Sequence, residues 1–200
     1  MALVFGRWSS EGVKFSDLSL ARYIILDSRS VPHSFGKQNK KAFARGKMSV
    51  VERLINKAMR SGQGKRKLSG KYIRGRGSCG KKLQTMRIVE ESFAIVEKKT
   101  KQNPLQVLVK ALENAAPRED ITKIKKGGIA YAVAVDVAPL TRLDEALKNI
   151  ALAGFVGSFN RKKSAAEALA EELILASQED QKSLSVKRRD EVERIAKSSR

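Results

Sequence analysis

Residues 121–137 read ITKIKKGGIAYAVAVDV, and this stretch decides what kind of fold the chain forms. Its second half alternates large apolar residues with alanine, which is the two-residue period of a β-strand. The pair Gly127-Gly128 separates two such runs, as the turn of a β-hairpin does. We predict a hairpin at about residues 119–137. Isolated hairpins are only marginally stable, so its base should be anchored on helices by its valines, Val133, Val135 and Val137.

Helical periodicity lies on both sides of this hairpin. Apolar residues recur at intervals of three and four residues, which places them on one face of a helix. The fold class is therefore mainly α, a six-helix domain with a protruding β-hairpin between the third and fourth helices. The predicted helices cover about residues 48–61, 83–100, 104–115, 143–151, 164–177 and 187–196.

Several helix ends and core positions can be predicted from local sequence. Ser49 with Glu52, and Ser164 with Glu167, have the spacing of capping boxes, and Asn103-Pro104 is typical of a helix start. Leu54 and Leu112 lie in the middle of two apolar stripes. We expect both leucines in the core.

The chain before the first periodic helix has a different character. Residues 1–47 contain short apolar bursts separated by Gly, Ser and charged residues, without a period. We interpret them as an extended basic N-terminal arm that becomes ordered on a partner, followed by a helical domain at 48–200. A Gly/Lys/Arg-rich insertion at about 62–82 interrupts that domain.

Positive charge is concentrated in one block of the sequence. Between Lys37 and Lys82 there are sixteen Lys or Arg residues and one acid, Glu52, in a chain of formal net charge +20. Such clustering destabilises a compact state by self-repulsion, whereas binding to phosphates releases counterions and favours it. A solvated basic surface would need no clustering, so we favour nucleic-acid binding. The helix face with Arg53, Lys57 and Arg60 adjoins the block and is predicted to contact phosphate.

Composition and short motifs exclude several other classes. His33 and Cys79 are the only residues of their types, so they build neither a zinc site nor a disulfide, and no cofactor is expected. No apolar run approaches the ~20 residues of a membrane span. Residues 75–80 match GxGxxG, and residues 75–82 nearly match a P-loop, but no buried strand precedes them. We expect an intracellular protein that is not an enzyme and has no membrane or small-molecule partner.

The central run is more specific than these short motifs. The segments NPLQVLV (103–109), APRED (116–120) and AVDVAPLTR (134–142), with the glycine pair between them, resemble the small-subunit ribosomal protein seven family. The resemblance extends to VERLIN (51–56), LAEELI (169–174) and VERIAKSSR (192–200). The segments FGRW (5–8) and VPH (31–33) and the Ser-Ser-Arg terminus resemble archaeal and eukaryotic members. The stretch 63–79 is longer and more basic than the loop expected there.

This resemblance implies a function and a set of partners. It implies a cytoplasmic structural constituent of the small ribosomal subunit, which binds the ribosomal RNA of the head domain and organises its assembly. Neighbouring small-subunit proteins would be partners, and the hairpin would lie near the exit site for messenger and transfer RNA. The cations implied or predicted to face RNA are Lys37, Lys40, Lys41, Arg45, Lys47, Arg53, Lys57, Arg60, Lys65, Arg66, Lys67, Arg74, Arg76, Lys81, Lys82, Arg118, Lys123, Lys125, Lys126, Arg142, Arg161, Lys162, Lys163 and Arg200.

Two competing functions share part of this pattern. A DNA-binding architectural or chromatin protein would also be basic and helical, but no helix-turn-helix pattern is apparent. An RNA-processing enzyme would need a catalytic constellation, and the lone His33 and Cys79 provide none. Stacking of RNA bases on Phe35 or Tyr72 is a minor additional expectation.

Overall fold

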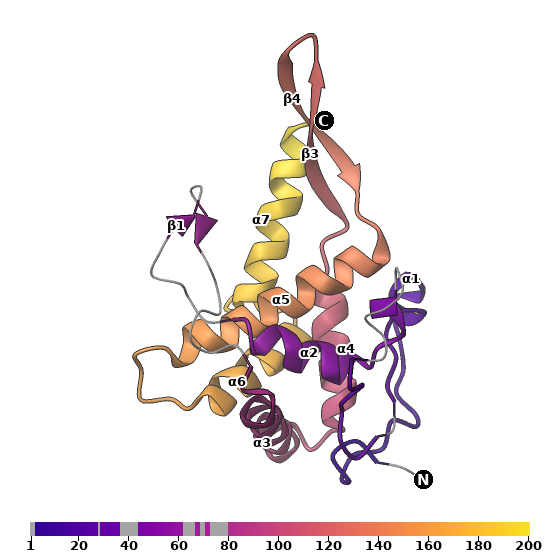
Figure 1. The fold of residues 1–200 in the computed structure, drawn as a ribbon, viewed down its shortest axis with the longest axis vertical. Coiled ribbons are helices and arrows are strands. Elements are labelled where there is room, and N and C mark those ends of the chain that lie inside the picture. Colours follow the sequence, from indigo (N-terminus) through magenta and orange to yellow (C-terminus); the bar gives the residue numbers. More distant parts are fainter. Residues whose placement is uncertain (1–2, 28, 37–43, 62–66, 69–70, 73–79) are drawn as a thin grey trace.

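The computed structural model describes residues 3–27, 29–36, 44–61, 67–68, 71–72 and 80–200. Within them, helices dominate and one long hairpin projects beyond the helical body (Figure 1). The helices are α1 (Leu18–Ala21), α2 (Val50–Ala58), α3 (Lys82–Thr100), α4 (Pro104–Ala115), α5 (Pro139–Ser158), α6 (Ala165–Ser177) and α7 (Leu184–Ser198). A 3-10 turn, η2 (Ala44–Lys47), precedes α2. The mainly helical fold with its hairpin is confirmed.

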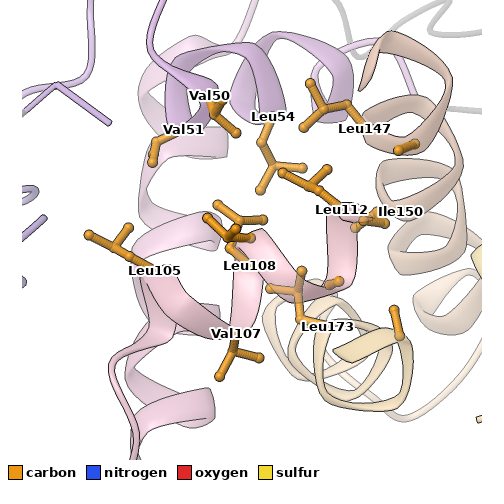
Figure 2. Packing of buried hydrophobic residues seen from close by; sticks show 14 of the residues in the cluster. Val50, Val51, Leu54, Leu105, Val107, Leu108, Leu112, Leu147, Ile150 and Leu173 are labelled. Carbon is orange, nitrogen blue, oxygen red and sulfur yellow. The ribbon is translucent and has the colours of Figure 1, made fainter. Parts of the chain in front are cut away.

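Helix α4 forms the centre of the core. Leu105, Leu108 and Leu112 have no exposed surface and pack among side chains from α2, α5 and α6 (Figure 2). Leu54 of α2 is equally buried, so both leucines predicted in the core are confirmed. Eight of the twelve residues of α4 are buried, so other helices pack against most of its faces.

The structure contains some, but not all, of the helix caps predicted from the sequence. The Asn103 side chain accepts from the Leu105 N–H, and Ser164 and Glu167 form both bonds of the predicted capping box. Ser49 makes no side-chain cap bond, so the capping box predicted there is wrong, and Glu52 bonds elsewhere. Pro139 is the first residue of α5, since its fixed φ suits a first helical turn.

The predicted hairpin is present with its turn at the glycine pair. β3 (Glu119–Lys126) pairs antiparallel with β4 (Ile129–Asp136), in the register that places Lys126 opposite Ile129. Gly127 and Gly128 have φ values of 59° and 84°, a conformation that glycine adopts without strain. A second, two-residue pairing, β1 (Lys67–Leu68) with β2 (Lys71–Tyr72), lies within the basic insertion.

The base of the hairpin is held differently from the prediction. Val133 and Val135 are 38% and 37% exposed, so they do not anchor it by burial. Helix α7 packs along β3 instead (Figure 1). Glu193 Oε1 accepts from the backbone N–H of Arg118 at 2.9 Å. The period of β4 identified a strand but could not show which helix covers it.

The N-terminal segment departs most from the prediction, because part of it belongs to the core. Val4, Trp8, Leu20 and Ile24 are buried with the helices. The Trp8 indole N–H donates to Glu97 at 3.1 Å, and its ring meets Phe93 edge to face at 5.7 Å. These residues were missed because an extended segment needs no helical or strand period to bury single side chains.

Side chains of α4 bind this segment through its backbone. The Gln106 amide accepts from the Lys14 N–H at 2.7 Å and donates to the Lys14 carbonyl at 2.9 Å. Glu113 accepts from the N–H groups of Ser16 and Asp17. The Lys14 N–H and carbonyl and the N–H groups of Ser16 and Asp17 therefore find partners without joining a helix or sheet.

Candidate nucleic-acid interface

The projecting hairpin has two chemically different faces. Paired residues of antiparallel strands share a face, so Lys123 with Ala132, and Lys125 with Ala130, lie on one side. Both lysines are exposed, and the small alanines leave the backbone accessible between them. The opposite side carries the pair Ile124–Tyr131 and further large apolar residues.

A second group of exposed cations lies at the ends of helices. Arg60 follows α2, Lys81 precedes α3, and Arg161 and Lys162 lie between α5 and α6. Within the described part of the chain these four cations make no ion pair, nor do Arg118, Lys123 and Lys125. Lys163 is also exposed, but it pairs with Glu171 at 2.7 Å. Cations that lack an acidic partner in their own chain can neutralise phosphates.

Arg53 takes a different role from the predicted one. Its side chain is 4% exposed, and its guanidinium pairs with Asp144 of α5 at 3.2 Å. Lys57 pairs with the same carboxylate at 3.3 Å and Arg45 at 3.5 Å. In this structure Arg53 is held by an acid 91 residues later in the chain, and the phosphate contact expected of it stays a prediction.

The electrostatics of this Asp144 cluster follow from its geometry. Burial by itself would raise the pKa of the Asp144 carboxyl, but the charges of Lys57 and Arg53 outweigh it, and the pKa lies below its ordinary value of 3.8. The carboxylate therefore stays ionised and joins η2 and α2 to α5. Of the three cations, Arg45 remains the most exposed, at 69% of its side chain.

Arg142 is the second predicted RNA contact that the structure places in a buried ion pair. Its guanidinium is 9% exposed and donates to Asp17 at 2.9 Å, to Ser19 at 2.8 Å and to the Pro117 carbonyl at 3.2 Å. These bonds tie the N-terminal segment to α5 and to the start of the hairpin. As with Arg53, the partner acid lies far away in sequence, so local sequence could not identify it.

Two further cations are paired rather than free. Lys82 Nζ contacts the Glu52 carboxylate at 2.7 Å, and the same carboxylate accepts from the Ser34 N–H and hydroxyl. Arg200 pairs with Glu119 at the base of the hairpin. Lys47 is exposed on η2.

Some predicted positions lie outside what the structure describes. The backbones of Lys67 and Lys126 are placed in strands, but their side chains are not described. The remaining positions of this kind, outside the described residues altogether, are Lys37, Lys40, Lys41, Lys65, Arg66, Arg74 and Arg76. Residues 75–79 of the glycine-rich motifs, including Cys79, fall outside as well.

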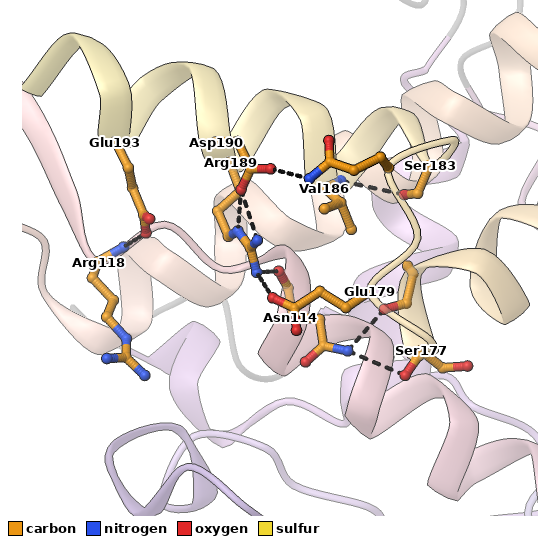
Figure 3. Close-up of polar contacts among 11 residues, drawn as sticks. Asn114, Arg118, Ser177, Glu179, Ser183, Val186, Arg189, Asp190 and Glu193 are labelled. Atoms are coloured by element: carbon orange, nitrogen blue, oxygen red, sulfur yellow. Dashed lines mark hydrogen bonds and ion pairs between the residues drawn. The ribbon is translucent and has the colours of Figure 1, made fainter.

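Sequence reasoning missed several exposed cations of α7. Arg194 and Lys197 lie near the hairpin base, and Lys187 lies nearer the start of the helix. Arg189 of the same helix is instead held by Glu179 at 2.7 Å, Asp190 at 2.6 Å and the Asn114 carbonyl at 2.7 Å (Figure 3). The charge of α7 was visible in the sequence, but its position along β3 was not.

Other site chemistries find little support in the described residues. There, no group of three or more His, Cys, Asp or Glu residues is arranged to hold a metal ion. No helix in the described ranges is both long and apolar enough to cross a membrane. His33 Nδ1 accepts from the Phe35 N–H at 2.8 Å, and the two rings stack, which gives that histidine a local structural role.

Comparison with known proteins identifies the family. A family model described as ribosomal protein S7p/S5e matches residues 20–200. This chain belongs to that family. Three archaeal relatives carry the name small ribosomal subunit protein uS7. The one from Methanothermobacter thermautotrophicus is 45% identical over 199 residues, covering both chains completely. Those from Methanococcus maripaludis and Methanosphaera stadtmanae are 46% and 44% identical, over at least 97% of each chain.

The family assignment bears on two earlier interpretations. The resemblance inferred from residues 103–142 and from both ends of the chain is confirmed, and the relatives are of the archaeal type. A ribosomal-protein family is a family of structural components and not of enzymes, which agrees with the absence of a catalytic constellation in the sequence. The free cations of the hairpin and helix ends are therefore best examined as an RNA-binding surface.

Proposed function

We propose that this protein is a structural constituent of the cytoplasmic small ribosomal subunit, where it binds ribosomal RNA of the head domain and organises its assembly. The name and full-length similarity of the archaeal relatives support the subunit. The observation that carries RNA binding is the distribution of unpaired cations. They gather on one face of a projecting hairpin and at helix ends, while Arg53 and Arg142 are buried in ion pairs.

In this proposal the RNA contacts come from the exposed cations. They are Arg60, Lys81, Arg118, Lys123, Lys125, Arg161 and Lys162, with Lys47 and Lys163 beside them. The segments with Lys37, Lys40 and Lys41, and with Lys65 to Arg76, add contacts from outside the described residues. The lysine-bearing face of the hairpin would follow the RNA near the exit site for messenger and transfer RNA. The other face is left for neighbouring small-subunit proteins.

Binding measured at matched salt tests this function. The full chain is titrated with folded small-subunit ribosomal RNA and, separately, with duplex DNA of equal length in nucleotides. We expect tighter binding to the folded RNA and a loss of on the order of a thousandfold between 50 and 200 mM salt, if ~6 or more phosphates are neutralised. Equal affinity for both polymers would favour an architectural DNA-binding protein. A flat salt dependence would contradict the electrostatic surface.

A further inference from the structure

A cavity of about 270 Å³ opens on the surface where the ends of four helices meet. It lies between the end of α2, the beginning of α3, the last turns of α5 and the beginning of α6, and described residues form it. Its walls are mostly apolar, with the Phe155 ring among them. The apolar lining includes Ala58, Ile88, Ala151, Phe155 and Leu169.

This cavity is not a sign of loose packing. A Cβ built on Gly154 would lie 3.2 Å from the Leu169 side chain, and one on Gly157 would lie 3.1 Å from Ala168. Helices α5 and α6 therefore approach one another as closely as side chains allow, directly beside the cavity. The cavity therefore lies beside a closely packed helix pair, and pockets of this kind are usually formed before a ligand binds.

The rim of the cavity is polar and carries positive charge. Lys81 and Gln84 line it, both residues are exposed, and neither side chain has a hydrogen-bond or ion-pair partner in the described part of the chain. The Ser61 and Ser158 hydroxyls donate to helix carbonyls, which leaves their oxygens able to accept. Among the described residues that line the cavity there is no acid, and Arg60 lies next to Ser61 in the sequence.

We propose that this cavity binds a nucleobase extruded from an unpaired or bulged segment of the RNA, an inference that rests on the proposed RNA binding. Unstacked bases of RNA are recognised by stacking on aromatic rings and by hydrogen bonds to their edges. Phe155 supplies the ring, the Gln84 amide can pair with a base edge, and Lys81 neutralises the adjacent phosphate. An apolar protein side chain would use the walls but leave Gln84 and Lys81 without partners.

The cavity volume agrees with a ligand of this size. Pockets for drug-sized molecules begin at roughly 300 Å³, so a cavity slightly smaller suits one planar base. Two of the polar lining residues, Lys81 and Gln84, are exposed, which suits a base attached to a charged backbone. The exposed cations at Arg60 and Arg161 are placed on the neighbouring helix ends, where that backbone would continue.

A pair of phenylalanines provides the matched test. Phe155→Leu removes an aromatic residue that lines the cavity. Phe159→Leu removes a neighbouring ring whose centroid lies 5.2 Å from that of Phe155. Phe159 is 62% exposed and does not line the cavity. Binding of the full chain to folded small-subunit ribosomal RNA should weaken about fivefold or more for Phe155→Leu, because stacking on an aromatic ring is lost. Phe159→Leu should bind within about twofold of the unchanged protein. The salt slope should stay the same in both.

A second pair keeps the test independent of folding. Gln84→Ala alters an exposed rim residue, and Gln102→Ala alters an exposed residue at the end of α3, outside the cavity. We expect at least about fivefold weaker RNA binding for the first, because a bidentate contact to a base edge is lost. No change is expected for the second. Equal binding by all four variants, with the unchanged protein still bound to RNA, would overturn the base-binding site and leave the proposed function standing.

The identity of the occupant is tested directly by crosslinking. A photoreactive benzoylphenylalanine replaces Gln84 in the full chain, and the protein is irradiated within reconstituted small subunits. We expect crosslinks to one or two unpaired ribosomal RNA nucleotides. Crosslinks to a ribosomal protein, or only to this chain itself, would contradict the proposal. If the unchanged protein does not bind ribosomal RNA at all, it is the proposed function that fails.

Discussion

The Asp144 cluster and the hairpin use the same cationic residue types in opposite ways. On α2, Arg53 is 4% exposed and paired with a carboxylate of α5. On β3, Lys123 and Lys125 are exposed, and the structure shows no acidic partner for them in its described residues. The difference shows that the fold pairs some cations with acids and leaves others exposed. Charge density in the sequence shows how many cations there are, and tertiary contacts decide which of them are free.

Removing the shared acid should have the largest effect. Asp144→Ala leaves the guanidinium of Arg53 buried without its partner, and breaking a buried pair in this way costs about 3–5 kcal/mol of unfolding free energy. Chemical denaturation of the full chain measures it. Glu171→Ala breaks the exposed pair with Lys163 and should cost ~1 kcal/mol or less. If the two variants are equally stable, the cluster has no structural role and the comparison fails.

The pH dependence of the unfolding free energy also tests whether the ion pairs of Asp144 stabilise the fold. The pKa of Asp144 is lowered in the folded protein, because the charges of Lys57 and Arg53 outweigh burial. Its contribution is therefore fully present above its unfolded pKa, about 3.9, and is lost as pH falls through the lower folded value. We expect unfolding free energy to decline below about pH 4, and less steeply in Asp144→Asn. Glu91→Gln, at an exposed acid of α3, should leave the pH profile unchanged.

A hairpin double substitution tests the other side of the comparison. Lys123→Ala with Lys125→Ala removes two free cations and no ion pair. The slope of log affinity for ribosomal RNA against log salt should decrease by about 1.4 to 1.8, since each phosphate contact contributes ~0.7–0.9. Unfolding free energy should change by no more than ~0.5 kcal/mol. An unchanged salt slope would mean that the hairpin does not meet phosphate.

Most of the fold, but only part of the candidate site, could be predicted from the sequence. Gly127-Gly128 and the alternation after it located the hairpin and its turn, and the helical stripes located Leu54 and Leu112, because these signals depend on neighbouring residues only. The pairs Arg53–Asp144 and Arg142–Asp17 join residues 91 and 125 positions apart. Sequence reasoning without the fold could not match them. Trp8 was missed for a related reason, since a single buried residue in an extended segment leaves no period.

Shortening the hairpin should have the smallest effect on stability and separates fold from function most cleanly. Deleting Lys125, Lys126, Ile129 and Ala130 removes two complete cross-strand pairs and leaves the glycine turn on the pair Ile124–Tyr131, in unchanged register. The pairs that are lost lie at the exposed tip, away from the base beside α7, so unfolding free energy should change by ~0.5 kcal/mol or less. Incorporation into small subunits should persist, because the helix-end cations remain. Exit-site behaviour, measured as reading-frame maintenance, should be disturbed, because the tip would no longer reach the RNA there.

A matched control replaces Ala130 and Ala132 with serine at full length, which keeps both lysines and the reach of the hairpin, and should leave both measurements unchanged. A shortened protein that unfolds would show instead that the tip stabilises the helical body. The contrast between a structural cluster and a functional hairpin would then be lost.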